Sequence, residues 1–323
     1  MRKITYAKAI KEAMEQMMKR DKRVFLIGQG VTSPWYVGNT CEGLFEKFGE
    51  KRVIDAPVSE AAITGVAIGA AMTGMRPILV HPRMDFMLLA MDQIINQAAN
   101  WYYMFGGKVN VPLVVRGIIN RGEEQAAQHS QALQAMFAHT PGLKVVMPAT
   151  PYDAKGLLIS AILDPNPVIY IDDRWLYDEE GEVPKGVYSV PIGKGIIRKR
   201  GKDITIVAAS YLVPAAMKAG EIFKKEKVDV EIIDLRTVKP LDDKIIFDSV
   251  KKTGRLVIAD VGWQSFGVSA EISSRVSEKL LKNLKVPIKR VALPDAPAPA
   301  SSALEKFYYP NEKDIIKAVK EII

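Results

Sequence analysis

The sequence predicts an α/β protein of two domains, each built on a largely parallel sheet. Short apolar segments alternate with segments whose apolar residues recur at helical spacing, which is typical of a parallel sheet covered by helices on both faces. A segment rich in acidic residues, Gly and Pro interrupts this pattern at 172–191. Since 323 residues exceed what one hydrophobic core usually supports, we expect a first domain at 1–175, a linker at 176–193 and a second domain at 194–323.

The expected elements follow from these two patterns. Residues 5–19 form a helix because Ala9, Ala13 and Met17 share one helical face. In the first domain the apolar segments predict strands at 24–27, 53–54, 77–80, 111–115, 144–147 and 168–171. Between them we expect helices at 41–48, 59–73, 85–104, 131–137 and 152–163. The second domain repeats the alternation, with strands at 204–208, 230–233, 256–259 and 288–291 and helices at 213–225, 242–251, 269–281 and 311–322.

Composition excludes several classes of protein. Hydrophobic residues make up 48% and charged residues 25%, which is ordinary for a soluble globular chain. The net charge is +8, but Lys and Arg are interspersed with Glu and Asp and no basic run is interleaved with aromatics, so we expect no nucleic-acid partner. No signal peptide opens the chain and Glu60–Gly74 is too short for a membrane span, so we expect a cytoplasmic protein that does not bind a membrane. The single cysteine, Cys41, excludes a disulfide framework and a cysteine-based metal cluster.

Several common ligand motifs are missing from the sequence. No Gly-x-Gly-x-x-Gly follows an expected strand, and there is no P-loop, no pair of histidines at helical metal-ligand spacing and no Gly-Asp-Gly. A dinucleotide fingerprint is therefore absent.

Glu60 is the first candidate for chemistry. It follows the expected N-cap Ser59 and opens a helix that is apolar on nearly all faces, a pattern that indicates burial in the middle of a protein. One interpretation is an acid that stabilises the positive end of the helix dipole. The other is a desolvated carboxyl group with a raised pKa, held for proton exchange.

The three histidines give further candidates. His129 lies between a polar loop and a helix start, where it could be an acid, a base or a hydrogen-bond bridge. His139 lies at a helix C-terminus, where a structural role is favoured. His81 follows a parallel strand, so it lies with Arg83, Asp85 and Phe86 on the edge of the sheet where ligands bind. A structural cluster at that edge is the alternative.

The chain also resembles a known family over nearly its whole length. The matching blocks are 52–55, 59–61, 91–99, 106–107, 111–117, 128–131, 141–146, 152–157, 233–237, 239–242, 262–263 and 267–272. In these blocks the chain resembles the beta subunit of the thiamine-diphosphate-dependent decarboxylating component of 2-oxoacid dehydrogenase complexes, of the pyruvate, branched-chain or acetoin type, within the transketolase-like family. The resemblance implies a pyrimidine-binding first domain and a transketolase-type C-terminal second domain.

The resemblance implies roles for individual residues. Glu60 matches the glutamate that hydrogen-bonds the aminopyrimidine ring, where a dry carboxyl stabilises the imino tautomer that activates the cofactor. Phe86 matches the aromatic residue that packs on this ring, and His129 matches the active-site histidine near the reacting carbon and the acyl acceptor. The backbone carbonyls that match a monovalent-cation site, expected to hold K⁺, belong to Leu113, Ala161, Asp164 and Asn166.

The resemblance also explains why the sequence lacks a Gly-Asp-Gly. In the family that motif binds the diphosphate and its Mg²⁺ on a separate alpha subunit, so the resemblance implies half a cofactor site and an assembly of two alpha and two beta chains. A dihydrolipoyl acyltransferase core is a further partner implied through the second domain.

Two departures from the family concern the substrate. Gln29-Gly30 stands where relatives have an acidic residue, and residues 80–86 read Val-His-Pro-Arg-Met-Asp-Phe where the family has Glu-Phe-Met-Thr-Phe-Asn-Phe. His81 and Arg83 would add polar donors or a cation near the cofactor, so we hypothesise a 2-oxoacid donor more polar or anionic than pyruvate. Alternatively Arg83 pairs with Asp85 or Asp92.

Three functions are weighed against one another. The first is the beta subunit of a 2-oxoacid dehydrogenase that passes its acyl group to lipoamide. The second is a transketolase-like or acetoin-type enzyme with another acceptor and no acyltransferase core. The third is a non-catalytic assembly subunit, against which the presence of Glu60, Phe86 and His129 argues.

Overall fold

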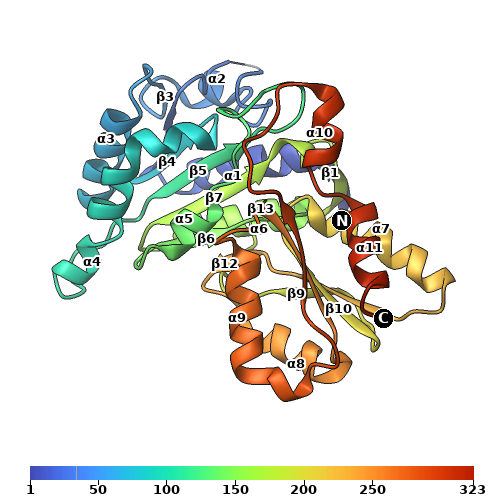
Figure 1. Ribbon diagram of the computed structural model, residues 1–323. Helices are drawn as coiled ribbons and strands as arrows, with labels where there is room; N and C mark the ends of the chain where they lie inside the picture. The colour runs from blue at the N-terminus through green and yellow to red at the C-terminus, as the bar shows by residue number, and fades with distance from the viewer. Residues whose placement is uncertain (34) are drawn as a thin grey trace.

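The structure, a computed structural model, describes residues 1–33 and 35–323. It contains two main sheets, each covered by helices on both faces, and a small two-stranded sheet (Figure 1). The two-domain α/β class predicted from the sequence is confirmed. No helix among the described residues is long and apolar enough to cross a membrane.

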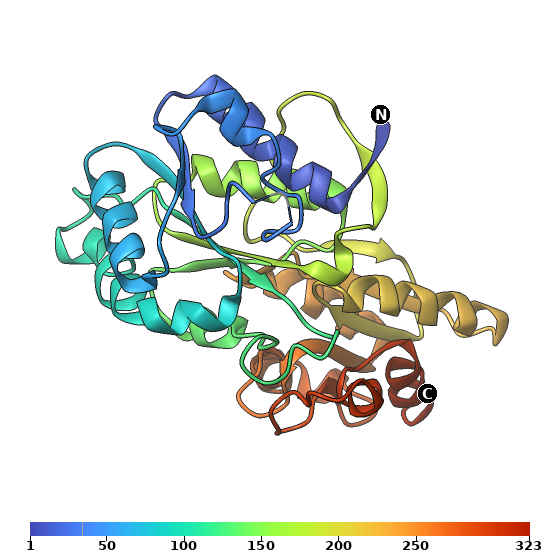
Figure 2. The ribbon, with the colours of Figure 1, turned by 90° about the horizontal axis from the view of Figure 1, so that it is seen from above.

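The first sheet has seven strands in the order β12-β6-β7-β5-β4-β2-β3, all parallel except β12. Its strands are β2 (Val24–Gly28), β3 (Val53–Asp55), β4 (Arg76–His81), β5 (Val114–Ile119), β6 (Lys144–Val146), β7 (Val168–Asp173) and β12 (Thr237–Lys239). Helices α1 (Tyr6–Arg20) and α6 (Pro151–Leu163) lie side by side on one face (Figure 2). Helix α3 (Glu60–Met72) packs on the other face with η1 (Met84–Ala90) and η2 (Asp92–Ala98).

The second sheet has five strands in the order β14-β13-β10-β11-β9, with β9 antiparallel to β11. Its strands are β9 (Ile196–Lys199), β10 (Ile204–Ala208), β11 (Val230–Asp234), β13 (Leu256–Trp263) and β14 (Lys289–Leu293). Helices α7 (Leu212–Lys225) and α11 (Glu312–Lys320) cover one face, and α8 (Asp243–Thr253) and α9 (Val268–Leu280) the other. The remaining short helices are α2 (Leu44–Phe48), α4 (Trp101–Met104), α5 (Gln134–His139), η3 (Arg174–Leu176), η4 (Leu281–Asn283) and α10 (Ser302–Tyr308).

A shared strand and a group of salt bridges connect the two domains. Strand β12 comes from the second half of the sequence but completes the first sheet beside β6. At the start of α6, Asp153 is fully buried and pairs with Arg198 and with Arg236, whose Nη2 lies 2.7 Å from Oδ1. Arg198 also lies 2.7 Å from Asp234. These contacts fix the second domain against the first-domain helix that carries Asp153.

Two expectations about secondary structure are wrong. The single helix expected at 85–104 is divided into η1, η2 and α4. The buried residues show why: Met84, Met87 and Ala90 recur every three positions, as a 3₁₀-helix requires, whereas Ala90, Ile94 and Ala98 recur every four. Strand β1 (Arg2–Thr5) and strand β8 (Glu180–Val183) were not expected, and they pair antiparallel, so part of the segment expected as a linker is regular.

Candidate functional site

Glu60 is buried at the carboxyl edge of the first sheet. Strand β3 ends at Asp55, and α3 begins at Glu60 itself, whose side chain is only 5% exposed. Gln29, which directly follows the neighbouring strand β2, donates from Nε2 to Glu60 Oε1 at 3.3 Å. No hydrogen bond from the described residues reaches Glu60 Oε2. One carboxylate oxygen is therefore fixed by the protein, while the other is left for a ligand. Ser59 occupies the N-cap position, but the expected side-chain capping bond is not formed.

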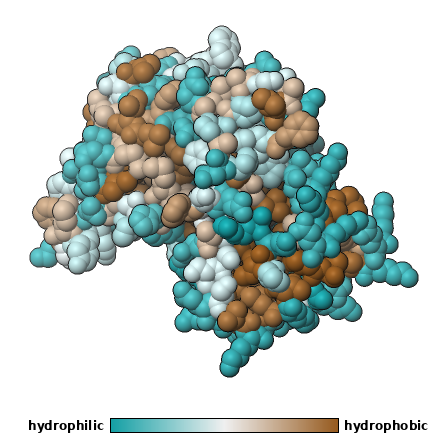
Figure 3. Space-filling model, in the orientation of Figure 1, coloured by the Kyte–Doolittle hydropathy of each residue, from teal (hydrophilic) through white to brown (hydrophobic). Residues whose placement is uncertain are grey.

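One face of α3 is uncovered. Residues Ile63, Ala67 and Ala71 are buried against the sheet, but the opposite face is exposed and made of small or apolar residues: Ala61, Ala62, Gly65, Val66 and Gly69. Val66 is 61% exposed, and exposed Leu89 lies on the adjoining η1. Apolar side chains are visible over this part of the molecule in Figure 3. The expectation that the helix is buried all round is wrong for the single chain. An exposed apolar helix face of this kind is typical of a surface that contacts another protein.

Phe86 and His129 lie together beside this helix. Their rings meet edge to face with centroids 5.5 Å apart, and both side chains are partly exposed. Asp85, next to Phe86 in the chain, accepts a hydrogen bond at Oδ1 from the backbone N–H of Gln131 at 3.1 Å. Burial raises the pKa of the Asp85 carboxyl, and its Oδ2 is buried without a hydrogen-bond partner among the described residues. Asp85 thus anchors the segment that carries His129.

His81 is not available to a ligand. Its side chain is 1% exposed, and burial lowers its pKa from 6.5 to about 4, so the ring is neutral at physiological pH. Its Nε2 lies 3.4 Å from Oγ1 of Thr64, one turn into α3. The expectation that His81 adds a donor or cation near the cofactor is therefore not supported by its position. It supports the helix that presents Glu60.

Arg83 lies at the edge of the sheet, but it does not form the ion pair with Asp85 or Asp92 that was the alternative. Its guanidinium donates to the backbone oxygen of Pro82 at 3.0 Å and to Gln125 Oε1 at 3.5 Å. Neither Asp85 nor Asp92 lies within ion-pair distance of it, although both residues are described by the structure. Asp92 instead accepts from Asn96.

The expected cation-binding carbonyls gather at one end of α6. Asp164 caps α6, and Leu113 precedes the strand that pairs with Val168. Arg76 Nη1 donates to the Asp164 carbonyl at 3.2 Å and to that of Ile162 at 2.7 Å, so a guanidinium already contacts this cluster. Asn166 Oδ1 is buried without a hydrogen-bond partner among the described residues. No cluster of three His, Cys, Asp or Glu side chains suited to a metal is found in the described part of the chain.

Sequence reasoning missed two residues at the carboxyl edge of the first sheet. Gln29 was noted only as a departure from the family, and Arg174 was not singled out. Both directly follow parallel strands, β2 and β7, and this shared position is the signal that could have found them.

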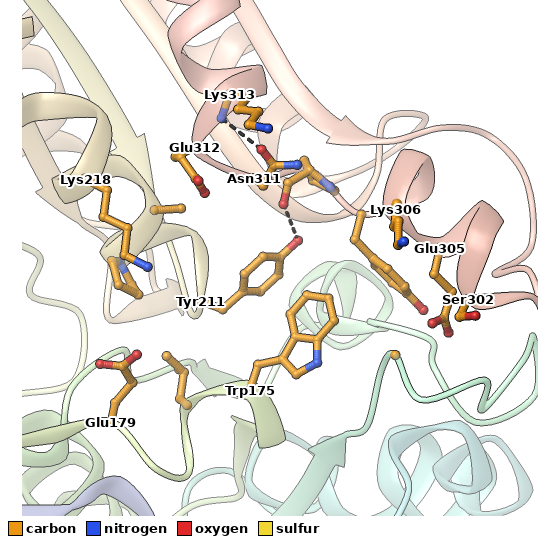
Figure 4. Close-up of a pocket in the computed structure, with 16 residues that line it drawn as sticks. Trp175, Glu179, Tyr211, Lys218, Ser302, Glu305, Lys306, Asn311, Glu312 and Lys313 are labelled. Atoms are coloured by element: carbon orange, nitrogen blue, oxygen red, sulfur yellow. Dashed lines mark hydrogen bonds between the residues drawn. The ribbon is translucent and has the colours of Figure 1, made fainter. Parts of the chain in front are cut away.

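A cavity of about 770 Å³ lies away from Glu60, between the two domains (Figure 4). Trp175, Tyr211 and Tyr309 line it and surround the Arg121 guanidinium, which is 4.8 Å from the Tyr211 ring centroid. Arg121 also lies 3.2 Å from Asp173, and both side chains are fully buried. This cluster fixes the start of the loop that leads to His129.

The fold is a two-domain α/β architecture with a buried carboxylate at the carboxyl edge of its first sheet. The chain belongs to the transketolase-like family: the pyrimidine binding domain of transketolase matches residues 2–179, and the transketolase C-terminal domain matches residues 193–315.

Curated relatives match over almost the full length. The chain is 42% identical to the pyruvate dehydrogenase E1 component subunit beta of Rickettsia felis, over 99% of this chain and 98% of the relative. It is 43% identical to the beta subunit of acetoin:2,6-dichlorophenolindophenol oxidoreductase of Cupriavidus necator, over 99% and 97%. Identity to the 2-oxoisovalerate dehydrogenase subunit beta of Bacillus subtilis is 41%, over 99% and 98%. A solved structure titled "Split gene transketolase, inactive beta4 tetramer" has the same fold, with a TM-score of 0.81, 20% identity and coverage of 99% and 98%.

Proposed function

We propose that this chain is the beta subunit of a thiamine-diphosphate-dependent 2-oxoacid dehydrogenase and contributes the pyrimidine half of the cofactor site. The observation that carries the proposal is Glu60, a buried carboxylate with one oxygen held by Gln29, beside a helix face that none of the described residues covers. Because no Gly-Asp-Gly is present, the diphosphate and Mg²⁺ are assigned to an alpha chain. Two alpha and two beta chains complete the enzyme, with the alpha chain covering α3.

The residues present fit the cofactor's pyrimidine ring. Glu60 would share a proton with a ring nitrogen, and the half-buried Phe86 would pack on the ring face. When bound, thiamine diphosphate supplies the carbanion that adds to the 2-oxo carbon and stabilises the charge left by loss of CO₂. Sharing that proton requires that water is excluded, and the apolar side of α3 provides part of that exclusion.

His129 is proposed as the acid–base residue that faces the acyl acceptor. Its packing on Phe86 and the Asp85–Gln131 hydrogen bond fix it beside the ring site. In the overall reaction the bond between the first two carbons of the acid breaks and CO₂ leaves. The acyl group then bonds to one sulfur of the lipoyl disulfide, and the other sulfur takes a proton. A dihydrolipoyl acyltransferase core would carry this lipoyl group.

The test is a Glu60→Gln variant purified with its alpha chain. The amide cannot share a proton, so decarboxylation should fall by at least a hundredfold while the assembly retains its native mass by light scattering. Glu46→Gln, at an exposed position, is the matched control and should keep full activity. An active Glu60→Gln assembly would exclude the proton role of Glu60.

An acetoin-type activity is the second candidate, favoured by the 43% identity to the acetoin oxidoreductase subunit. Reduction of a dye by the assembled enzyme, with acetoin and with pyruvate as alternative donors, distinguishes the two.

We also propose that the carbonyls of Leu113, Ala161, Asp164 and Asn166 hold K⁺, supported by the orphaned Oδ1 of Asn166 at the C-terminal end of α6. The melting temperature should rise in KCl relative to choline chloride of equal ionic strength. Equal melting temperatures in the two salts would contradict the K⁺ site and would leave Arg76 as the cation that binds the carbonyls at this end of α6.

A further inference from the structure

Two arginines at this edge of the sheet form no ion pair among the described residues. Arg83 and Arg174 are both partly buried, and neither lies within ion-pair distance of a carboxylate in the described part of the chain. Their hydrogen bonds go to neutral acceptors: Arg83 to Pro82 O and Gln125 Oε1, and Arg174 to Tyr36 O at 2.6 Å. Arg83 Nε and Arg174 Nε are each buried with no acceptor among residues 1–33 and 35–323.

The carboxylates on β7 and η1 are engaged with other groups, whereas Glu42, Glu123 and Asp178 line one pocket with Arg174 without forming an ion pair with it. Asp172 takes two hydrogen bonds from the buried Arg116, at 2.8 and 2.7 Å. Asp173 pairs with Arg121 and accepts from the Trp175 backbone. The pKa of Asp85 is raised by burial, which disfavours its charged form. None of these groups neutralises the two guanidinium ions.

The order of strands brings the two arginines together. Arg174 directly follows β7 and Arg83 lies two residues beyond β4, and both strands flank β5 in the same parallel sheet. The loop after β5 lies between them, and its Gln125 accepts from both Arg83 and Asn120. The pKa of Arg83 is lowered first by burial and then by the positive charge of Arg174. Holding two like charges close together without an anion is costly, and an anion between them removes that cost.

This pair also adjoins the ring site. The backbone N–H of Phe86 donates to Arg83 O at 3.2 Å, and Gln125 is on the loop that ends at His129. An anion held by both guanidinium groups would therefore be part of a molecule that reaches toward Phe86 and His129. The carboxylate next to the 2-oxo group leaves as CO₂, so the anion held here is a second one, at the far end of the acid.

We propose that Arg83 and Arg174 bind the distal carboxylate of a dicarboxylic 2-oxoacid, which makes such an acid the donor of this enzyme. Planar guanidinium groups match a carboxylate through paired hydrogen bonds. The inference rests on the proposed function, which it narrows from 2-oxoacids in general to dicarboxylic ones. His81, the other polar residue expected to act on the substrate, takes no part because it is buried and neutral.

The experiment measures dye reduction by the assembly of this chain with its alpha chain. The donors are a five-carbon and a four-carbon dicarboxylic 2-oxoacid, pyruvate and a branched-chain 2-oxoacid. We expect the highest kcat/KM with one of the dicarboxylic acids. Arg83→Met and Arg174→Met should each raise its KM by about tenfold or more, with a much smaller change in kcat, because each removes charged hydrogen bonds. Arg83→Lys should restore part of the loss, and Arg200→Met, at an exposed turn, should change nothing.

A second readout does not depend on turnover. Glutarate, which has two carboxylates and no 2-oxo group, should bind the assembly in a calorimetric titration, and both Met variants should weaken that binding. Preference for pyruvate or a branched-chain acid, or unchanged kinetics in the Met variants, would overturn the inference while leaving the proposed function intact. An assembly that decarboxylates none of the 2-oxoacids would instead overturn the proposed function.

Discussion

The buried His81 makes a quantitative prediction about stability and pH. Its pKa is lowered from 6.5 to about 4 in the folded chain because the ring is desolvated. In the unfolded chain the ring is in water and takes up a proton near pH 6.5. Between these two pKa values the unfolded state binds a proton that the folded state does not, so the free energy of unfolding must fall as pH falls.

The size of this loss follows from the shift. Each pKa unit is worth about 1.4 kcal/mol, so lowering the pH from about 7 to about 4.5 should cost roughly 2.5 kcal/mol through His81 alone. The group is fully buried, so screening by solvent does not reduce this value. His81→Phe places an apolar ring at the same position and removes the titrating group.

The assay is urea unfolding of the chain and of His81→Phe at the two pH values. Carboxylates contribute equally to both proteins, so the difference between them isolates the histidine. The variant should lose about 2.5 kcal/mol less than the parent when the pH is lowered. Thr64→Val, which removes only the hydroxyl near Nε2, should keep the parent's pH dependence. Equal losses in the parent and in His81→Phe would refute the buried, neutral imidazole.

Three further predictions concern other buried groups. Gln29→Leu removes the hydrogen bond to Glu60, and turnover of the assembled enzyme should fall about tenfold with an unchanged circular dichroism spectrum; full turnover would contradict it. Asp172→Asn leaves the Arg116 guanidinium buried without its counter-ion, so urea unfolding should show a loss of about 3–5 kcal/mol, and a loss below about 1 kcal/mol would contradict it. Burial raises the pKa of the Cys41 thiol, so a thiol reagent at about pH 7 should label it only in denaturant; rapid labelling of the folded chain would be the contrary result.

Local sequence patterns predicted which strands and helices exist more reliably than the residues at which they begin and end. Strands β2, β4 and β7 were expected from apolar segments within two residues of where they lie, because strands covered on both faces have a strong, continuous signal. The segment 85–104 was expected as one helix, since its composition suits any helix type. Only packing against α3 and the sheet decided between helix types. It produced a 3₁₀-helix in η1, where every third residue is buried, and a π-helix in η2, where the buried residues are four apart.

The sequence by itself determined the fold class, the family and the position of Glu60, since a strand, a turn and a helix start are encoded by neighbouring residues. It also showed that the diphosphate motif is missing. Only the tertiary structure decided which groups act with Glu60. Strand order brings Gln29 to it, buries His81 behind it and places Arg174, from β7, with Arg83, from β4. Burial and neighbouring charge depend on which strands lie side by side, and no local stretch of sequence contains that information.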